Sequence, residues 1–186
     1  EATERDQRRL KTRLQRAKLR LSACIEDIDY RHPRGLDQSL MTKLTACQWV
    51  YERHNVLIIG PTGIGKTWLA CALGHKACRD GLSVLYLRLP RFLQEVSIAK
   101  GDGRYVRLMK ALAKTDLLIL DDWGLVGLKD AQRQDLLATF RAILMTPAGE
   151  QRAYVCAMMT SVVELALHDC CADSQSSLVR LLSETP

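Results

Sequence analysis

The sequence lacks several features that would each place it in a special class of protein. No apolar run approaches the ~20 residues that a membrane-spanning helix needs, and the N-terminus has no apolar signal-peptide core. The seven cysteines are scattered without a C-x-x-C pair, which argues against a zinc site and against a secreted disulfide framework. Internal repeats and low-complexity segments are also missing. These absences favour a reduced, cytoplasmic protein of one domain without membrane attachment.

The composition that remains is that of an ordinary globular protein. Of the 186 residues, 47% are hydrophobic and 26% are charged. A domain of this size buries roughly 70% of the surface that its unfolded chain exposes, so a substantial core is possible. The first methionine is Met41. We therefore expect the chain to be a fragment.

Positive charge is concentrated at the N-terminus. Residues 1–20 contain eight Lys or Arg against three acids, a net charge of +5 out of +6 for the whole chain. A basic segment ahead of a nearly neutral body is typical of proteins that contact nucleic acid or another polyanion. The alternative interpretation is a solvated helix face with no partner.

The periodicity of the sequence changes at residue 55. Before it, the apolar spacing predicts a helix over 4–21, an extended connector over 22–37 and a helix over 38–53. After it, short apolar runs at 55–59, 83–89 and 117–120 alternate with helical patterns at 68–79, 90–101 and 105–113. Continuous apolar strands that alternate with helices are typical of a parallel sheet built from βαβ units. The sequence therefore predicts an α/β fold.

One glycine-rich segment follows the first predicted strand and matches G-x-x-x-x-G-K-[ST]. It consists of Gly60, Pro61, Thr62, Gly63, Ile64, Gly65, Lys66 and Thr67. Such a loop turns successive backbone N–H groups toward phosphate oxygens, and the positive end of the following helix adds to the attraction. Lys66 is expected on the β- and γ-phosphates and Thr67 on Mg²⁺. A chance match in a glycine-rich turn is disfavoured by the strand before it and the helix after it.

Two acids, Asp121 and Asp122, end the third predicted strand. The carboxyl ends of parallel strands meet at one edge of the sheet, which brings these acids close to the phosphate loop. Asp121 is expected to hold Mg²⁺, directly or through water. Asp122 is then placed to act as the general base that polarises the attacking water. Lys66, on the phosphates, is the second expected catalytic residue. The alternative is a pair of turn or helix-capping aspartates.

Several shorter segments add a family resemblance. They are 27–31, 33–37, 47–49, 70–74, 101–105 and 118–124. With the phosphate loop, they make residues 1–137 resemble the IstB-like helper ATPases of insertion sequences, which are relatives of the DnaC helicase loaders in the AAA+ group. The resemblance implies a P-loop AAA+ three-layer core with a parallel sheet, and ATP and Mg²⁺ as cofactors. It also implies a homo-oligomer on duplex DNA and partnership with the element's transposase.

The resemblance divides the chain into three parts. Residues 1–37 form a basic helix and connector, 38–137 the ATPase core, and 138–186 a divergent tail in which no lid is recognisable. The family implies a fourth strand with a polar sensor residue, an arginine finger and a helical lid. In the tail only Val155–Met159, followed by Thr160 and Ser161, resembles the sensor strand. A reading-frame change or truncation near residue 138 is our hypothesis for the tail.

The function that follows is an ATP-binding AAA+ helper of DNA transposition. It hydrolyses ATP with Mg²⁺ if the tail supplies the missing catalytic parts, because a transition-state arginine can contribute ~10³–10⁵ in rate. A DnaC-like helicase loader and a non-catalytic nucleic-acid-binding remnant are the alternatives. A small-molecule kinase is disfavoured, because the acid pair suits water activation and no Arg-rich lid is visible.

Overall fold

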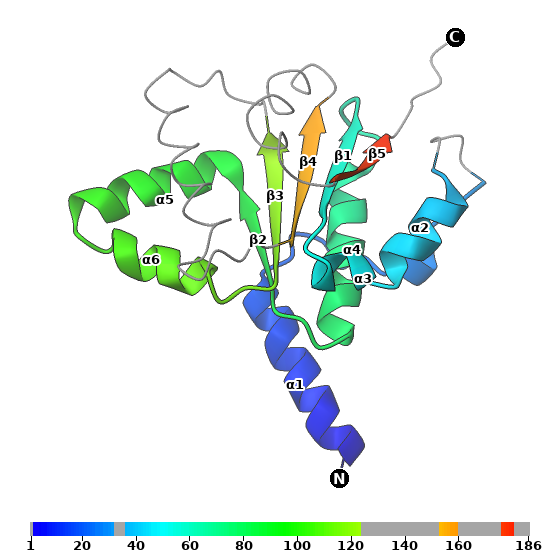
Figure 1. Ribbon diagram of the computed structural model, residues 1–186, viewed down its shortest axis with the longest axis horizontal. Helices are drawn as coiled ribbons and strands as arrows, with labels where there is room; N and C mark the ends of the chain where they lie inside the picture. Colours follow the sequence, from blue (N-terminus) through cyan, green and yellow to red (C-terminus); the bar gives the residue numbers. More distant parts are fainter. Residues whose placement is uncertain (1, 32–35, 124–152, 160–175, 181–186) are drawn as a thin grey trace.

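The structure is a computed structural model that describes residues 2–31, 36–123, 153–159 and 176–180. In these ranges five parallel strands form one sheet in the order β2-β3-β4-β1-β5 (Figure 1). The strands are β1 (Asn55–Gly60), β2 (Val84–Arg88), β3 (Leu117–Trp123), β4 (Ala153–Met159) and β5 (Ser176–Arg180). The predicted α/β class with a parallel sheet is confirmed.

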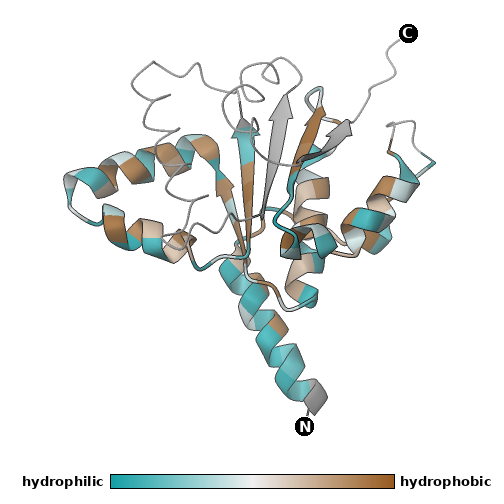
Figure 2. Cartoon of the chain, in the orientation of Figure 1, coloured by the Kyte–Doolittle hydropathy of each residue, from teal (hydrophilic) through white to brown (hydrophobic). Residues whose placement is uncertain are grey.

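Helices cover both faces of this sheet. They are α1 (Ala2–Ala17), α2 (Gln38–Thr45), α3 (Gln48–Tyr51), α4 (Lys66–Arg79), α5 (Leu89–Gly101) and α6 (Tyr105–Leu112). The first four pack into one apolar core, and α5 and α6 into a second core across the sheet (Figures 1 and 2). None of the described helices has the length and apolar character needed to cross a membrane.

The strands explain why the two cores are separate. All six residues of β1 are buried, with Val56 and Ile58 in the α4 core and Leu57 and Ile59 in the α5 core. Successive side chains of a strand point to opposite faces, so a strand covered on both sides reads as an unbroken apolar run. That run is the pattern from which the strand was predicted.

The N-terminal helices differ in length from their predictions. The helix predicted over 4–21 ends at Ala17, because Lys18 takes a left-handed conformation with φ +52°. The helix predicted over 38–53 is divided into α2 and α3 because Cys47 is left-handed as well, with φ +55°. The connector between α1 and α2 contains a short 3₁₀ turn (Ile25–Asp27). It buries Ala23, as expected of a connector that packs against the core.

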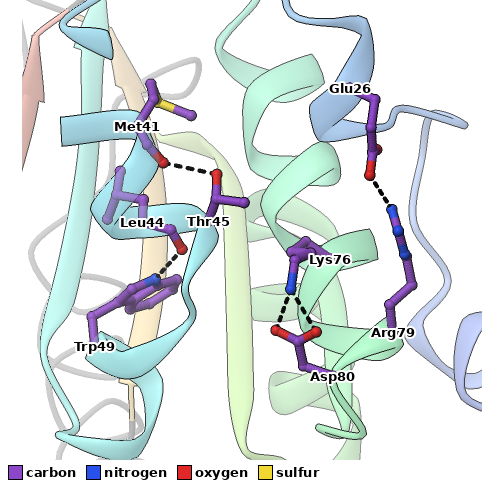
Figure 3. Close-up of polar contacts among 8 residues, drawn as sticks. All are labelled: Glu26, Met41, Leu44, Thr45, Trp49, Lys76, Arg79 and Asp80. Atoms are coloured by element: carbon purple, nitrogen blue, oxygen red, sulfur yellow. Dashed lines mark hydrogen bonds and ion pairs between the residues drawn. The ribbon is translucent and has the colours of Figure 1, made fainter. Parts of the chain in front are cut away.

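Two side-chain hydrogen bonds lie close to the break between α2 and α3, of which the one from Trp49 joins the two helices and the one from Thr45 lies within α2 (Figure 3). The Trp49 indole N–H donates to the Leu44 carbonyl at 2.9 Å, and the Thr45 hydroxyl donates to the Met41 carbonyl at 2.8 Å. Trp49 is 5% exposed and belongs to the apolar core.

Two strands, β4 and β5, come from the tail after residue 137. β4 lies between β3 and β1, so the strand predicted over 155–159 is present, while Thr160 and Ser161 lie outside the described residues. β5 was not predicted from the sequence. It pairs with β1 at the edge of the sheet through backbone hydrogen bonds. Its sequence begins with two serines, so it lacks the continuous apolar run from which the other strands were predicted.

Candidate nucleotide-binding site

The glycine-rich loop lies between the end of β1 and the start of α4. Gly63 and Gly65 have φ values of +89° and +96°, a backbone region in which a side chain is strained. Gly65 is also the N-cap of α4, and its carbonyl accepts the Leu69 N–H at 2.9 Å. The loop therefore leads directly into a helix N-terminus, which is the geometry that binds phosphate.

The Lys66 side chain folds back over the same loop. Its ammonium donates to the carbonyl oxygens of Gly60 at 2.8 Å and Pro61 at 2.5 Å. Partial burial lowers the pKa of Lys66, and the nearby Asp121 carboxylate opposes that shift. The ammonium is thus held over the loop by carbonyl groups, in reach of the loop concavity.

Asp121 joins the two nucleotide motifs. The Thr67 hydroxyl donates to Asp121 Oδ2 at 2.8 Å, so residues 54 positions apart meet where the carboxyl ends of β1 and β3 lie. The same oxygen accepts the Tyr86 hydroxyl at 2.5 Å. Asp121 is 4% exposed, and such a buried carboxylate needs these donors.

Tyr86 was not identified as a site residue from the sequence. It lies in β2, beside β3, and is 6% exposed. Burial raises the pKa of its hydroxyl, and the Asp121 carboxylate raises it further. A tyrosine inside an otherwise aliphatic strand was the available signal, because a buried tyrosine hydroxyl usually needs a hydrogen-bond partner.

Asp122 lies at an irregularity in β3. The pairing of β3 with β4 shifts register between Leu120 and Trp123, and Asp122 has a φ of +64°. Its side chain is 11% exposed. Arg88 donates to Asp122 Oδ2, and Arg20 Nη1 lies 4.0 Å from Oδ1. Bulges of this kind re-aim a side chain at the end of a strand.

Both arginines were missed by sequence reasoning. Arg88 ends β2, opposite Asp121 in the strand register, while Arg20 comes from the segment after α1. The ion pair with Asp122 raises the pKa of Arg88. Nothing in the local sequence around Arg20 indicates that it reaches the acid pair, since the contact depends on how α1 packs.

The donor set at this edge fits a magnesium nucleotide. Mg²⁺ prefers oxygen ligands, and proteins usually supply one or two of them while phosphates and water complete the shell. Thr67 and Asp121 are two such oxygen donors in direct contact. Backbone N–H groups of the loop and the Lys66 ammonium are the complementary groups for phosphate.

Comparison with known sequences agrees with this geometry. The family model described as IstB-like ATP binding protein matches residues 1–162. This match extends past residue 137, at which the resemblance based on motifs ends. The protein named for ATP binding in insertion sequence IS1162 of Pseudomonas fluorescens is 54% identical over 134 residues, 72% of this chain and 58% of that protein. Its counterpart in IS21 of Pseudomonas aeruginosa is 33% identical over 139 residues, 75% of this chain and 51% of that protein.

The fold has matches among solved structures. The DnaC helicase loader has a TM-score of 0.66 at 17% identity, covering 89% of this chain and 100% of that one. DnaA of Aquifex aeolicus bound to AMPPCP has a TM-score of 0.64 at 17% identity, covering 87% and 51%. These likenesses show the AAA+ fold. The chain spans little more than half the length of the curated relatives it matches, and it belongs to the IstB-like ATP-binding protein family.

Proposed function

We propose that this chain binds Mg²⁺·ATP and acts as an ATP-dependent helper of DNA transposition, in the cytoplasm, as a homo-oligomer on duplex DNA with the element's transposase. The observation that carries the nucleotide part is the Thr67–Asp121 hydrogen bond, which unites the phosphate loop with the acid pair. The transposition part is supported by the names of the relatives, which are ATP-binding proteins of insertion sequences.

Each site residue has a distinct task in this proposal. The loop from Gly60 to Thr67 cradles the phosphates through its N–H groups, and Lys66 exchanges its carbonyl partners for phosphate oxygens. Thr67 and Asp121 hold Mg²⁺, which neutralises charge on the phosphates when bound. Asp122 accepts a proton from the attacking water as general base, for which one of its carboxylate oxygens must be free of the arginines.

The DNA part of the proposal is supported by α1. Arg5, Lys11, Arg16 and Lys18 are exposed on or just after this helix, and among the described residues no acid pairs with them. Figure 2 shows that the protruding part of α1 is largely hydrophilic. Exposed cations without acidic partners are what a phosphate backbone binds.

Replacing Lys66 tests the nucleotide site. We expect Lys66→Ala to weaken binding of a fluorescent ATP analogue in the presence of Mg²⁺ at least 10-fold, because the only side-chain cation of the loop is removed. Lys43→Ala, which removes an exposed lysine of α2, is the matched control and should bind as the wild type does. Circular dichroism of both variants checks the fold. Unchanged binding by Lys66→Ala would refute the assignment of the phosphate loop.

The choice of partner is tested separately. Affinity purification of the tagged chain with Mg²⁺·ATP and duplex DNA should recover the transposase of the same element. Recovery of the replicative helicase in place of the transposase would contradict the transposition role and indicate a helicase loader. DNA binding by a chain that does not bind ATP would indicate a non-catalytic remnant.

A further inference from the structure

The segment that follows α1 runs toward the candidate ATP site. After the turn at Lys18, Leu19 packs against α4, where its Cδ2 atom lies 3.0 Å from the position of a Cβ placed on Gly74. Backbone groups of Arg20 and Leu21 oppose the rise in pKa that burial causes at the Cys71 thiol, also on α4. The segment therefore lies against the helix that begins at the phosphate loop.

The Arg20 side chain reaches the site at Asp122. Its Nη1 atom lies 4.0 Å from Asp122 Oδ1. Arg20 also opposes the rise in the pKa of the Tyr86 hydroxyl, which donates to Asp121. One side chain from the N-terminal segment thus faces the acid proposed to activate water, although Arg20 itself belongs to neither nucleotide motif.

Asp122 is consequently held between two guanidinium groups. Arg88 contacts Oδ2 from the neighbouring strand, while Arg20 faces Oδ1 from the N-terminal segment. A carboxylate held by charged donors is not free to orient a water. Arg88 is fixed in the sheet, whereas the position of Arg20 depends on the placement of α1.

The helix α1 is attached to the core along one side only. Leu10 and Leu14 pack against the apolar core, Ala17 is buried, and Arg13 Nε donates to the Cys78 carbonyl at 2.9 Å. The exposed cations named above lie on the solvent-facing part of the helix and just after its end. A polyanion that binds them acts directly on the helix from which the Arg20 segment continues.

We propose that Arg20 is a positioning residue for Asp122, through which a duplex bound on α1 controls the ATP site. This inference rests on the proposed function. Without DNA, Arg20 and Arg88 together hold Asp122 away from water. DNA bound to α1 withdraws Arg20, which frees Oδ1 of Asp122 to orient the water beside Mg²⁺·ATP while Arg88 keeps its contact with Oδ2. Mg²⁺·ATP favours the same released state, so each ligand strengthens the binding of the other.

An equilibrium measurement tests this coupling without requiring turnover. The affinity of the chain for a non-hydrolysable ATP analogue with Mg²⁺ is measured with and without saturating duplex DNA, and the affinity for DNA with and without the analogue. In the wild type we expect each ligand to strengthen the other at least about fivefold, the lower end of ordinary allosteric coupling. Arg107→Gln, an exposed arginine of α6 on the far side of the sheet, is the matched control and should keep that factor.

Arg20→Gln should increase the affinity for each ligand alone, an effect that misfolding cannot produce. We expect the variant to bind either ligand alone about as tightly as the wild type binds it in the presence of the other, with a coupling factor below about 2. Arg20→Lys, which keeps the charge but not the planar fork, should have an intermediate factor and serves as the second variant. Where hydrolysis is measurable, the basal rate of Arg20→Gln should rise toward the DNA-stimulated rate.

The outcomes separate the inference from the proposed function. Wild-type coupling in Arg20→Gln would overturn the role of Arg20. A wild type that binds both ligands independently would overturn the inference and leave the proposed function standing. A wild type that fails to bind the analogue or the duplex would contradict the proposed function itself, and the inference with it.

Discussion

At the scale of single residues, Asp121 Oδ2 links strands β2 and β3 to the end of the phosphate loop by hydrogen bonds. The Thr67 and Tyr86 hydroxyls both donate to this oxygen, in a carboxylate that is almost wholly buried. Thr67 and Asp121 could be predicted from their motifs. Tyr86 could not, because its contact depends on the pairing of β2 with β3.

Removing one hydroxyl tests the importance of this contact. We expect Tyr86→Phe to lower the free energy of unfolding by about 1–3 kcal/mol, because a buried carboxylate is deprived of a hydrogen-bond donor while the ring volume is kept. Urea unfolding measures the change. Tyr51→Phe, at a tyrosine that is 58% exposed, is the control and should stay within about 0.5 kcal/mol of the wild type. Equal stability of Tyr86→Phe and wild type would contradict the Asp121 hydrogen bond.

At the scale of elements, α4 lies unusually close to the sheet at Gly74. A Cβ at this position would come within 2.6 Å of Ile119 Cδ1 on β3 and 3.0 Å of Leu19 Cδ2. Ile119 is wholly buried, so it has little room to move. The glycine therefore sets the distance between the helix that carries Lys66 and the strand that leads to Asp121.

The close approach predicts opposite effects for two glycine substitutions. Gly74→Ala should lower the free energy of unfolding by about 1–2 kcal/mol, because overpacking outweighs the helix-forming advantage of alanine. Gly101→Ala, at the end of α5 with nothing within 4 Å of the added Cβ, should leave stability unchanged or raise it by up to about 1 kcal/mol. Thermal or urea unfolding compares the two. A stabilised Gly74→Ala would show that the core accommodates the methyl group.

Elements also differ in how well the sequence predicts them. The strand β1 was predicted because burial on both faces requires a continuous apolar run. The helix α4 was predicted because its buried side requires apolar residues at helical spacing. The breaks at Lys18 and Cys47 were not, because neither residue type is typical of a left-handed conformation. Tertiary packing selects those two turns.

At the scale of the whole molecule, positive charge lies on one protruding helix. Figure 1 shows α1 extending away from the sheet, at the opposite end of the strands from the phosphate loop. Cations in such a position can contact a long polyanion without blocking the nucleotide site. Binding by these cations should release counterions, which makes it sensitive to salt.

Salt dependence tests this charge distribution. Replacing Arg5, Lys11, Arg16 and Lys18 together by Gln should flatten the plot of log affinity for duplex DNA against log salt by up to about 3.6, or about 0.9 for each phosphate that is no longer neutralised. The control removes the same charge from Arg91, Arg107, Lys110 and Lys114, which are exposed on and near α5 and α6. Fluorescence anisotropy at several salt concentrations measures both slopes. Equal slopes for the two quadruple variants would contradict a DNA site on α1.

The fold class, the phosphate-loop motif and the acid pair could be predicted from residue types alone, because backbone curvature, strand burial and phosphate binding each demand particular residues at fixed spacing. The tertiary structure was needed to show that β4 enters between β3 and β1, that Tyr86 donates to Asp121, and that Arg20 reaches Asp122. These contacts join residues from separate elements. Their existence depends on strand order and on the packing of α1, which no local pattern in the chain records.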